Sequence, residues 1–342
     1  MSFFSIEMGV RLKKSNVLIK INELLDWKKI EEKLKSEREY LGGQQPYDSV
    51  KMFKAVLLGQ WYGLSDPELE NALNVRVDFM MFSGFELMQS CPDETTLCRF
   101  RNWLVLKGLD KLLFKEINRQ LEEKRIKIKE CRGSIIDATI IESASRPKRV
   151  IEEIAQDRKE DSTNEETQSA EDNGASKYIQ TQSKDPDARW LKKGNKSFFG
   201  YKGFARVDAE DGFIEDVLAR PANESETKHL DNLTQDLESK KIYTDKAYHS
   251  EANQTLLKNK KLKNGIMHRA FRGHPLSARE KLRNKLISKI RFRVEQCFGT
   301  LKRKFGLARA SYRGRFKVET QMRLKAICYN LLKAANKLEW AV

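Results

Sequence analysis

Hydrophobic positions recur at helical spacing through roughly the first 130 residues. The segment Ser65-Asp-Pro-Glu68 has the form of a helix start, because Ser65 can cap the helix and Glu68 stands where a capping box requires a carboxylate. Similar start signals predict helices that begin at Asp48, at Asp93 or Thr95, and after Gly108. Helices joined by short polar turns suit a compact DNA-binding module, and they suit a plain helical bundle equally well.

The pattern changes after Gly133. Residues 134–141 are rich in β-branched side chains and read as a buried central strand that is interrupted by one acid, Asp137. Residues 196–207 and 213–218 flank a polar turn and predict a hairpin. Short strands are expected at 241–245 and 264–268, and helices at 229–237, 277–306 and 317–338. This mixture predicts an α/β domain.

We therefore expect a helical N-terminal DNA-binding region over residues 1–130 and an α/β catalytic domain over residues 131–342. Residues 151–189 contain 11 acidic and five basic side chains, and no apolar period survives in them. Such a composition predicts a flexible acidic surface insertion within the second domain.

The composition excludes several classes of protein. No run approaches the ~18 apolar residues that span a bilayer, and the first residues lack the pattern of a signal peptide. The five cysteines are odd in number and show no C-x-x-C spacing, which argues against a disulfide framework and against a zinc ribbon. We expect a cytoplasmic protein with reduced, packed thiols.

Charge is the strongest compositional signal. The chain has 65 basic and 49 acidic residues, a net charge of +16. Residues 258–317 alone contain 20 Lys or Arg and two acids, Glu280 and Glu295, so this segment carries +18 and the rest −2. A basic block of this kind indicates a polyanionic partner such as nucleic acid. A basic face that merely contacts water is the alternative.

Three carboxylates stand out from this background. Asp137 interrupts a buried strand, where an uncompensated carboxylate would cost several kcal/mol. Asp245 ends a short apolar strand, a position that commonly lines a site in α/β domains. Taken alone, each of them is as compatible with a structural role as with a functional one.

Glu295 lies on the predicted helix 277–306, at the edge of the apolar stripe. At about 100° per residue, Arg291 and Lys302 share its face. A solvated ion pair between Arg291 and Glu295 is one interpretation, since they are four residues apart. A lone acid in a strongly basic segment favours a functional role.

Together the three acids provide what two-metal phosphoryl transfer requires. Hard divalent cations prefer carboxylate oxygens, and two such ions can activate an attacking oxygen and stabilise a leaving one. The four histidines are scattered, and no Walker loop or dinucleotide-binding glycine motif is present.

Four segments carry distinctive patterns: Asp137-Ala-Thr-Ile-Ile, Lys196-Ser-Phe-Phe-Gly-Tyr-Lys202, Tyr243-Thr-Asp245-Lys-Ala-Tyr, and Arg291-x3-Glu295-x6-Lys302. With the N-terminal run over residues 47–104, they resemble the DDE transposases of bacterial insertion sequences, in particular the insertion-sequence-five family. The resemblance covers roughly residues 40–335. One departure is Ser288, which stands where such transposases often have a Tyr, so no role of that Tyr is carried over.

The resemblance implies a ribonuclease H-like catalytic fold, with a mixed sheet flanked by helices. It implies that Asp137, Asp245 and Glu295 are the catalytic, metal-binding triad for two divalent ions, Mg²⁺ or alternatively Mn²⁺. It further implies phosphate contacts by Arg291 and Lys302. We regard Lys246 and Lys202 as further candidates for DNA binding.

The resulting hypothesis is a DNA transposase of the bacterial cytosol that binds the terminal inverted repeats of its element. It would cut the strand at the element's end and join the freed 3′-hydroxyl to target DNA. Its partners would be double-stranded DNA and further copies of the chain, as a homodimer or larger assembly on DNA, with no membrane. The rivals are a metal-dependent DNA nuclease that cuts without joining and a DNA-binding relative without catalysis.

Overall fold

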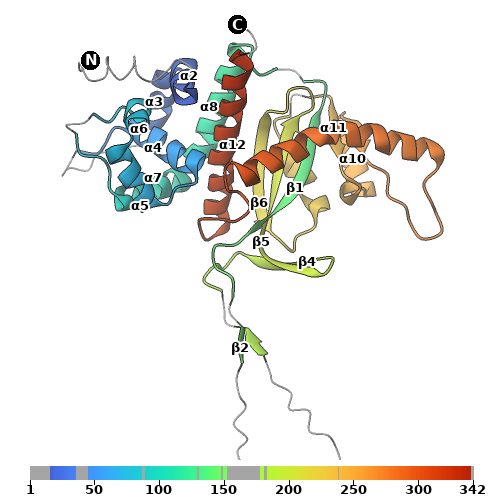
Figure 1. The fold of residues 1–342 in the computed structure, drawn as a ribbon. Helices are drawn as coiled ribbons and strands as arrows, with labels where there is room; N and C mark the ends of the chain where they lie inside the picture. Colours follow the sequence, from blue (N-terminus) through green and yellow to red (C-terminus); the bar gives the residue numbers. More distant parts are fainter. Residues whose placement is uncertain are drawn as a thin grey trace, which may run out of the picture.

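The computed structural model describes residues 16–35, 45–86, 89–128, 131–147, 149–151, 178–180, 183–237 and 239–339. Within these residues the first third of the chain is helical, and the remainder mixes strands and helices (Figure 1). The predicted insertion at 151–189 lies largely outside the described residues. At its two ends, strand β2 (Arg149–Ile151) pairs with strand β3 (Tyr178–Gln180) in antiparallel fashion.

The helices of the first third follow the expected start signals. Asp48 and Asp93 accept hydrogen bonds from backbone N–H groups at the starts of α4 and α7, and Gly108 precedes α8. Glu68 accepts a hydrogen bond from the Ser65 N–H, as the capping motif predicts. The helices are α2 (Val17–Leu24), α3 (Trp27–Lys35), α4 (Ser49–Tyr62), α5 (Asp66–Val75), α6 (Val77–Ser83), α7 (Glu94–Leu106) and α8 (Leu109–Glu123).

A mixed sheet forms the second part of the described chain, with the strand order β4-β5-β1-β7-β8 and with β6 also paired to β5. Strand β1 pairs antiparallel with β5 and parallel with β7, so it lies in the interior of the sheet, as its apolar sequence predicts. The strands are β1 (Ser134–Glu142), β4 (Arg189–Lys193), β5 (Lys196–Asp208), β6 (Ile214–Pro221), β7 (Lys241–Thr244) and β8 (Lys263–Ile266).

One expected helix is wrong in extent. Residues 229–237 form only α9 (Leu230–Leu233), after a 3₁₀ turn over Glu226–His229. The Thr234 hydroxyl donates to the carbonyl oxygens of Leu230 and Asp231, and Asp236 adopts a left-handed backbone conformation. Both features end the helix, because they offer the backbone an alternative to further helical hydrogen bonds.

Three more helices complete the fold: α10 (Glu251–Asn259), α11 (Ala278–Arg303) and α12 (Arg315–Glu339). Helix α12 stands between the N-terminal helices and the sheet, and α11 runs across the sheet and past its edge (Figure 1). None of the described helices is long and apolar enough to cross a membrane.

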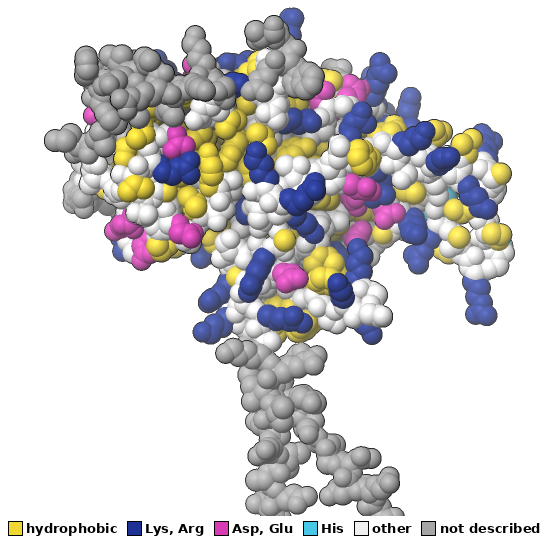
Figure 2. Space-filling model, in the orientation of Figure 1, with side chains coloured by type: hydrophobic (Ala, Val, Ile, Leu, Met, Phe, Trp, Pro, Cys, Tyr) yellow, Lys and Arg dark blue, Asp and Glu magenta, His cyan; other side chains and the backbone are white. Residues whose placement is uncertain are grey.

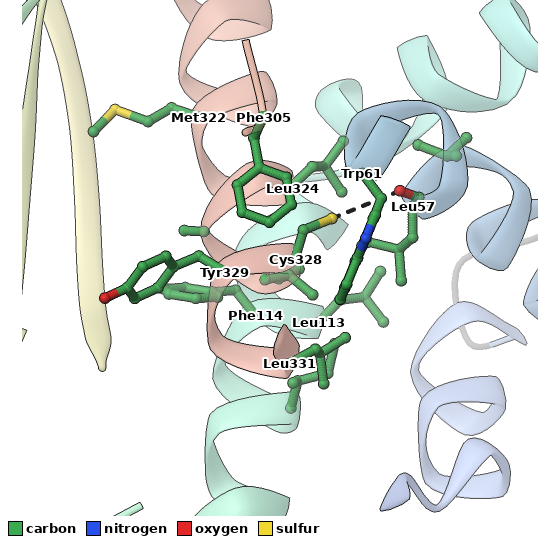
Figure 3. Packing of buried hydrophobic residues seen from close by; sticks show 14 of the residues in the cluster. Leu57, Trp61, Leu113, Phe114, Phe305, Met322, Leu324, Cys328, Tyr329 and Leu331 are labelled. Carbon is green, nitrogen blue, oxygen red and sulfur yellow. Dashed lines mark hydrogen bonds between the residues drawn. The ribbon is translucent and has the colours of Figure 1, made fainter. Parts of the chain in front are cut away.

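Helix α12 is buried on both sides. Cys328 packs among Leu57 and Trp61 of α4 and Leu113 of α8, and its thiol donates to the Leu57 carbonyl oxygen (Figure 3). Tyr329 points to the sheet side (Figure 3). Buried residues from the N-terminal helices, α11, α12 and the sheet form one continuous hydrophobic cluster. The domain boundary near residue 130 stays a prediction.

Buried polar contacts reinforce this junction. Asp110 of α8 pairs with Arg323 of α12 and accepts a hydrogen bond from the Thr320 hydroxyl at 2.8 Å. Glu319, on the same helix, pairs with Arg323 at 2.9 Å and accepts a hydrogen bond from the Ala219 N–H of β6 at 3.1 Å. Because these charges are buried, loss of one partner would leave an uncompensated charge in the interior.

Lys325 makes the stability of this junction depend on pH. It is buried in α12, and its ammonium group donates to the Phe305 carbonyl oxygen. Burial lowers its pKa to about 8, against about 10.4 in an unfolded chain. Between these values the unfolded chain keeps the proton and the folded chain releases it, so the free energy of unfolding rises with pH.

We predict that Lys325→Met removes this rise of the free energy of unfolding with pH. The stability of the variant relative to the wild type should fall by about 3 kcal/mol between pH 7 and pH 10.5. Urea unfolding at a series of pH values measures the difference. Lys317→Met, at an exposed position of the same helix, should retain the wild-type dependence. Parallel curves for Lys325→Met and the wild type would contradict the prediction.

Candidate active site beside two parallel strands

Asp137 and Asp245 are brought together by the pairing of β1 with β7. The parallel pairing ends at Ile136 and Thr244, and each aspartate is the next residue along its strand. The register of the sheet therefore places two carboxylates, 108 positions apart in the sequence, side by side at the point where the two strands stop pairing, within β1 and directly after β7.

A single guanidinium bridges the two acids. Nη2 of Arg291 lies 2.7 Å from Oδ2 of Asp137, and Nη1 lies 3.9 Å from Oδ1 of Asp245. Arg291 comes from α11, which packs against β1 and β7. Its side chain is 9% exposed, so this cation is withdrawn from solvent. The sequence predicted a phosphate contact for Arg291, and in the structure the side chain faces carboxylates instead.

The electrostatics of Asp137 reflect burial. Desolvation raises the pKa of this carboxyl group, and the charge of Asp245 raises it further. The charge of Arg291 and the Ala138 N–H oppose the shift, but the pKa stays above its ordinary value. Burial therefore disfavours the charged form of Asp137, and the neighbouring positive charge of Arg291 partly compensates for it.

Glu295 lies one helical turn beyond Arg291. The apolar stripe predicted for this helix is confirmed, since Ile287, Val294, Phe298 and Leu301 are all buried. Glu295 itself is exposed, and it forms no ion pair with the described residues. Within the described chain, no group of three or more His, Cys, Asp or Glu side chains is placed to hold a metal ion. The structure thus brings together Asp137 and Asp245, without Glu295.

The donors at this site suit a hard divalent cation. Two carboxylates converge on one positive group, and carboxylate oxygens are the ligands that Mg²⁺ and Mn²⁺ prefer. The Arg291 guanidinium provides part of the positive charge that the pair requires. Asp137 and Asp245 are thus the residues best placed to hold a metal, with Glu295 as the nearest further carboxylate along α11.

The predicted lysines occupy different surroundings. Lys202 of β5 and Lys302 of α11 line one cavity of about 530 Å³, next to Ala138 and Thr139 of β1. Lys202 donates to the Glu224 carbonyl oxygen and lies 3.6 Å from the Glu226 carboxylate. Lys246 is exposed beside Asp245. Lys and Arg side chains are spread over the face that carries α11 and β4 (Figure 2).

One residue of the site escaped the sequence reasoning. Tyr248 is fully buried three residues after Asp245, and its hydroxyl has no hydrogen-bond partner among the described residues. Burial, together with the charges of Glu226, Asp137 and Asp245, raises its pKa well above the ordinary value. The sequence indicated Tyr248 only as the last residue of the distinctive segment that begins at Tyr243.

Comparison with known proteins places this arrangement in a family. Residues 130–331 match the model of a transposase DDE domain, and residues 7–103 match that of a transposase domain. The transposase for insertion sequence element IS1106 of Neisseria meningitidis serogroup B is 43% identical over 241 residues, which cover 70% of this chain and 78% of that protein.

A solved structure, the piggyBac transposase synaptic complex with hairpin DNA, aligns with 94% of this chain and 73% of that chain, at 10% identity and a TM-score of 0.43. That likeness is too weak to bear on the family of this chain. The DDE domain implies a ribonuclease H-like fold, in keeping with the mixed sheet described above. Membership of the insertion-sequence-five family stays a prediction. The family models and the close relative together show that the chain belongs to the DDE transposases of bacterial insertion sequences and acts as a DNA transposase.

Proposed function

We propose that Asp137, Asp245 and Glu295 hold two divalent metal ions, Mg²⁺ or alternatively Mn²⁺, at which the protein cuts and joins DNA strands. The observation that carries the proposal is the convergence of Asp137 and Asp245 on one guanidinium, at the point where the parallel pairing of β1 with β7 ends. Bound ions of this kind activate an attacking oxygen and neutralise charge on the phosphate. Glu295 would complete the ligand set from α11.

Arg291 has two roles in this proposal. In the protein alone it balances the charges of Asp137 and Asp245. With cations bound at these carboxylates, the guanidinium would be available to a phosphate of the DNA, which its planar donors could bind in bidentate fashion. Lys302, Lys246 and Lys202 would neutralise further phosphates beside the reacting strand.

The DNA partners follow from the family and the charge. The α/β part would act on the element's terminal inverted repeats and on target DNA, and the N-terminal helices would recognise the repeats. Cutting both ends of an element in one complex requires at least two copies of the chain, so we propose a homodimer or larger assembly on DNA. The bacterial cytosol is where this substrate is found.

A first prediction tests the charge balance between Arg291 and the two aspartates. Arg291→Leu should lower the free energy of unfolding by about 3 kcal/mol without divalent ions, because Asp137 loses its buried partner. Added Mg²⁺ should then stabilise the variant more than the wild type, since the ion replaces the missing positive charge. Chemical denaturation with and without Mg²⁺ measures both effects.

The control for this experiment is Lys289→Leu, which removes an exposed cation from the same helix. It should match the wild type with and without Mg²⁺. If Mg²⁺ stabilises Arg291→Leu and the wild type equally, the ion does not bind at the carboxylates that Arg291 contacts.

A second prediction tests the chemistry. A DNA duplex that carries the element's own end is incubated with a plasmid target and Mg²⁺. The wild type should yield joined products, and Glu295→Gln should lower their rate about 100-fold or more, because a metal-binding carboxylate is lost. Glu280→Gln, which changes the other acid of the basic segment, should retain activity.

The products distinguish the rivals of this proposal. Cleavage by the wild type without joining would identify a metal-dependent nuclease. Specific binding to the repeat without cleavage, in both proteins, would identify a DNA-binding relative without catalysis. Equal joining by Glu295→Gln and the wild type would remove Glu295 from the site.

A further inference from the structure

A second feature lies beside the candidate active site and is not accounted for by the triad. The cavity of about 530 Å³ that begins at Ala138 and Thr139 extends past the end of β1 to the β4–β5 hairpin. Lys192 and Lys193 of β4 line it together with Lys202 and Lys302, and two acids line it, Glu142 and Glu226. Its apolar lining includes Ile140, Leu191 and Phe198.

The position of the cavity follows from the sheet. Strand β7 pairs with β1 only as far as Ile136, and the next backbone contact on that edge is between Glu142 and the Ala308–Ala310 segment. Between these two points the edge of β1 has no neighbouring strand among the described residues. The cavity therefore opens at a gap in the sheet that starts at Asp137.

Most of the positive charge at the cavity lacks a partner. Lys202 is engaged by Glu224 and Glu226, whereas Lys192, Lys193 and Lys302 form no hydrogen bond or ion pair with the described residues. Lys302 is half-buried, and burial together with the charge of Lys193 lowers its pKa, although the charge of Glu142 opposes this shift. Two ammonium groups that repel one another across a cavity favour an anionic ligand between them.

The dimensions indicate which anion. From Asp137 to Glu142 the strand advances about 16 Å, at about 3.3 Å per residue. This edge is much longer than a single phosphate group, so it can accommodate a short run of consecutive nucleotides. A cavity that is lined by both cations and apolar side chains is suited to a polynucleotide strand rather than to an isolated phosphate, because it can contact the phosphates and the bases.

We propose that Lys192 and Lys193 of the β4–β5 hairpin, together with Lys302, clamp the backbone of the DNA strand within a few nucleotides of the scissile phosphate. The inference rests on the proposed function and deepens it. It adds the hairpin lysines, which neither the sequence pattern nor the carboxylate site identifies, to the residues that hold the DNA.

The hairpin supplies its own control. Lys196 pairs with Lys193 across the β4–β5 turn and is equally exposed, but it does not line the cavity. Lys193→Ala and Lys196→Ala thus change the net charge equally, on neighbouring strands. Because both side chains are exposed, neither change should disturb folding. Lys193→Gln serves as a second variant if Lys193→Ala does not fold.

The experiment measures DNA binding by fluorescence anisotropy, in a double-mutant cycle that combines protein variants with modified DNA. The DNA is a duplex that carries the element's end, and no divalent ions are added. Single phosphates near the cleavage position are replaced by neutral methylphosphonates. For the wild type and Lys196→Ala, at least one replacement within a few nucleotides of that position should weaken binding several-fold. For Lys193→Ala that penalty should disappear, and the slope of log affinity against log salt should become less steep by about 1.

The outcomes separate this inference from the proposed function, because binding is measured without catalysis. Equal losses for Lys193→Ala and Lys196→Ala would overturn the clamp, since they would indicate a general basic face. Wild-type binding that is insensitive to every neutral phosphate in the window would also overturn it. A position-specific penalty that is lost only in Lys193→Ala would support it, even if the wild type yielded no joined products.

Discussion

The two-sided burial of α12 is the constraint on which the rest of the structure depends. Residues 320–331 of this helix are all buried, so it must be covered on more than one side. The N-terminal helices α2, α4 and α8 cover one side of it, and β6 with β5 covers another. Because β5 pairs with β1, and β1 with β7, this packing fixes the sheet in which Asp137 and Asp245 lie next to one another.

Local signals in the sequence were sufficient for most of the secondary structure. The caps at Asp48 and Asp93 and the hairpin between β5 and β6 depend on residues close together in the chain, so their patterns identify them. The helix expected over 229–237 failed for an equally local reason. Its apolar spacing was suitable, but Thr234 and Asp236 form contacts that end the helix after one turn.

The candidate site could be predicted only in part, because its geometry is not local. The sequence placed Asp137 within a strand and Asp245 at a strand end, but the adjacency of these strands depends on the parallel pairing of β1 with β7. Helical periodicity gave the angle between Arg291 and Glu295, but not the tilt of α11 against the sheet. That tilt buries Arg291 against the aspartates and leaves Glu295 exposed. The role of Lys192 and Lys193 could not be predicted either, because the cavity that they line is formed by residues far apart in the sequence.

The β2–β3 pairing has a consequence for how this chain can change in length. The two short strands bring residues 151 and 178 side by side before the chain continues toward β4. The spacing of β1, β5 and β7 is therefore independent of how many residues connect those two points. Since closing a loop twice as long costs only about 0.6 kcal/mol more, insertions or deletions can accumulate there, and a foreign domain could be grafted there, without displacing the catalytic carboxylates.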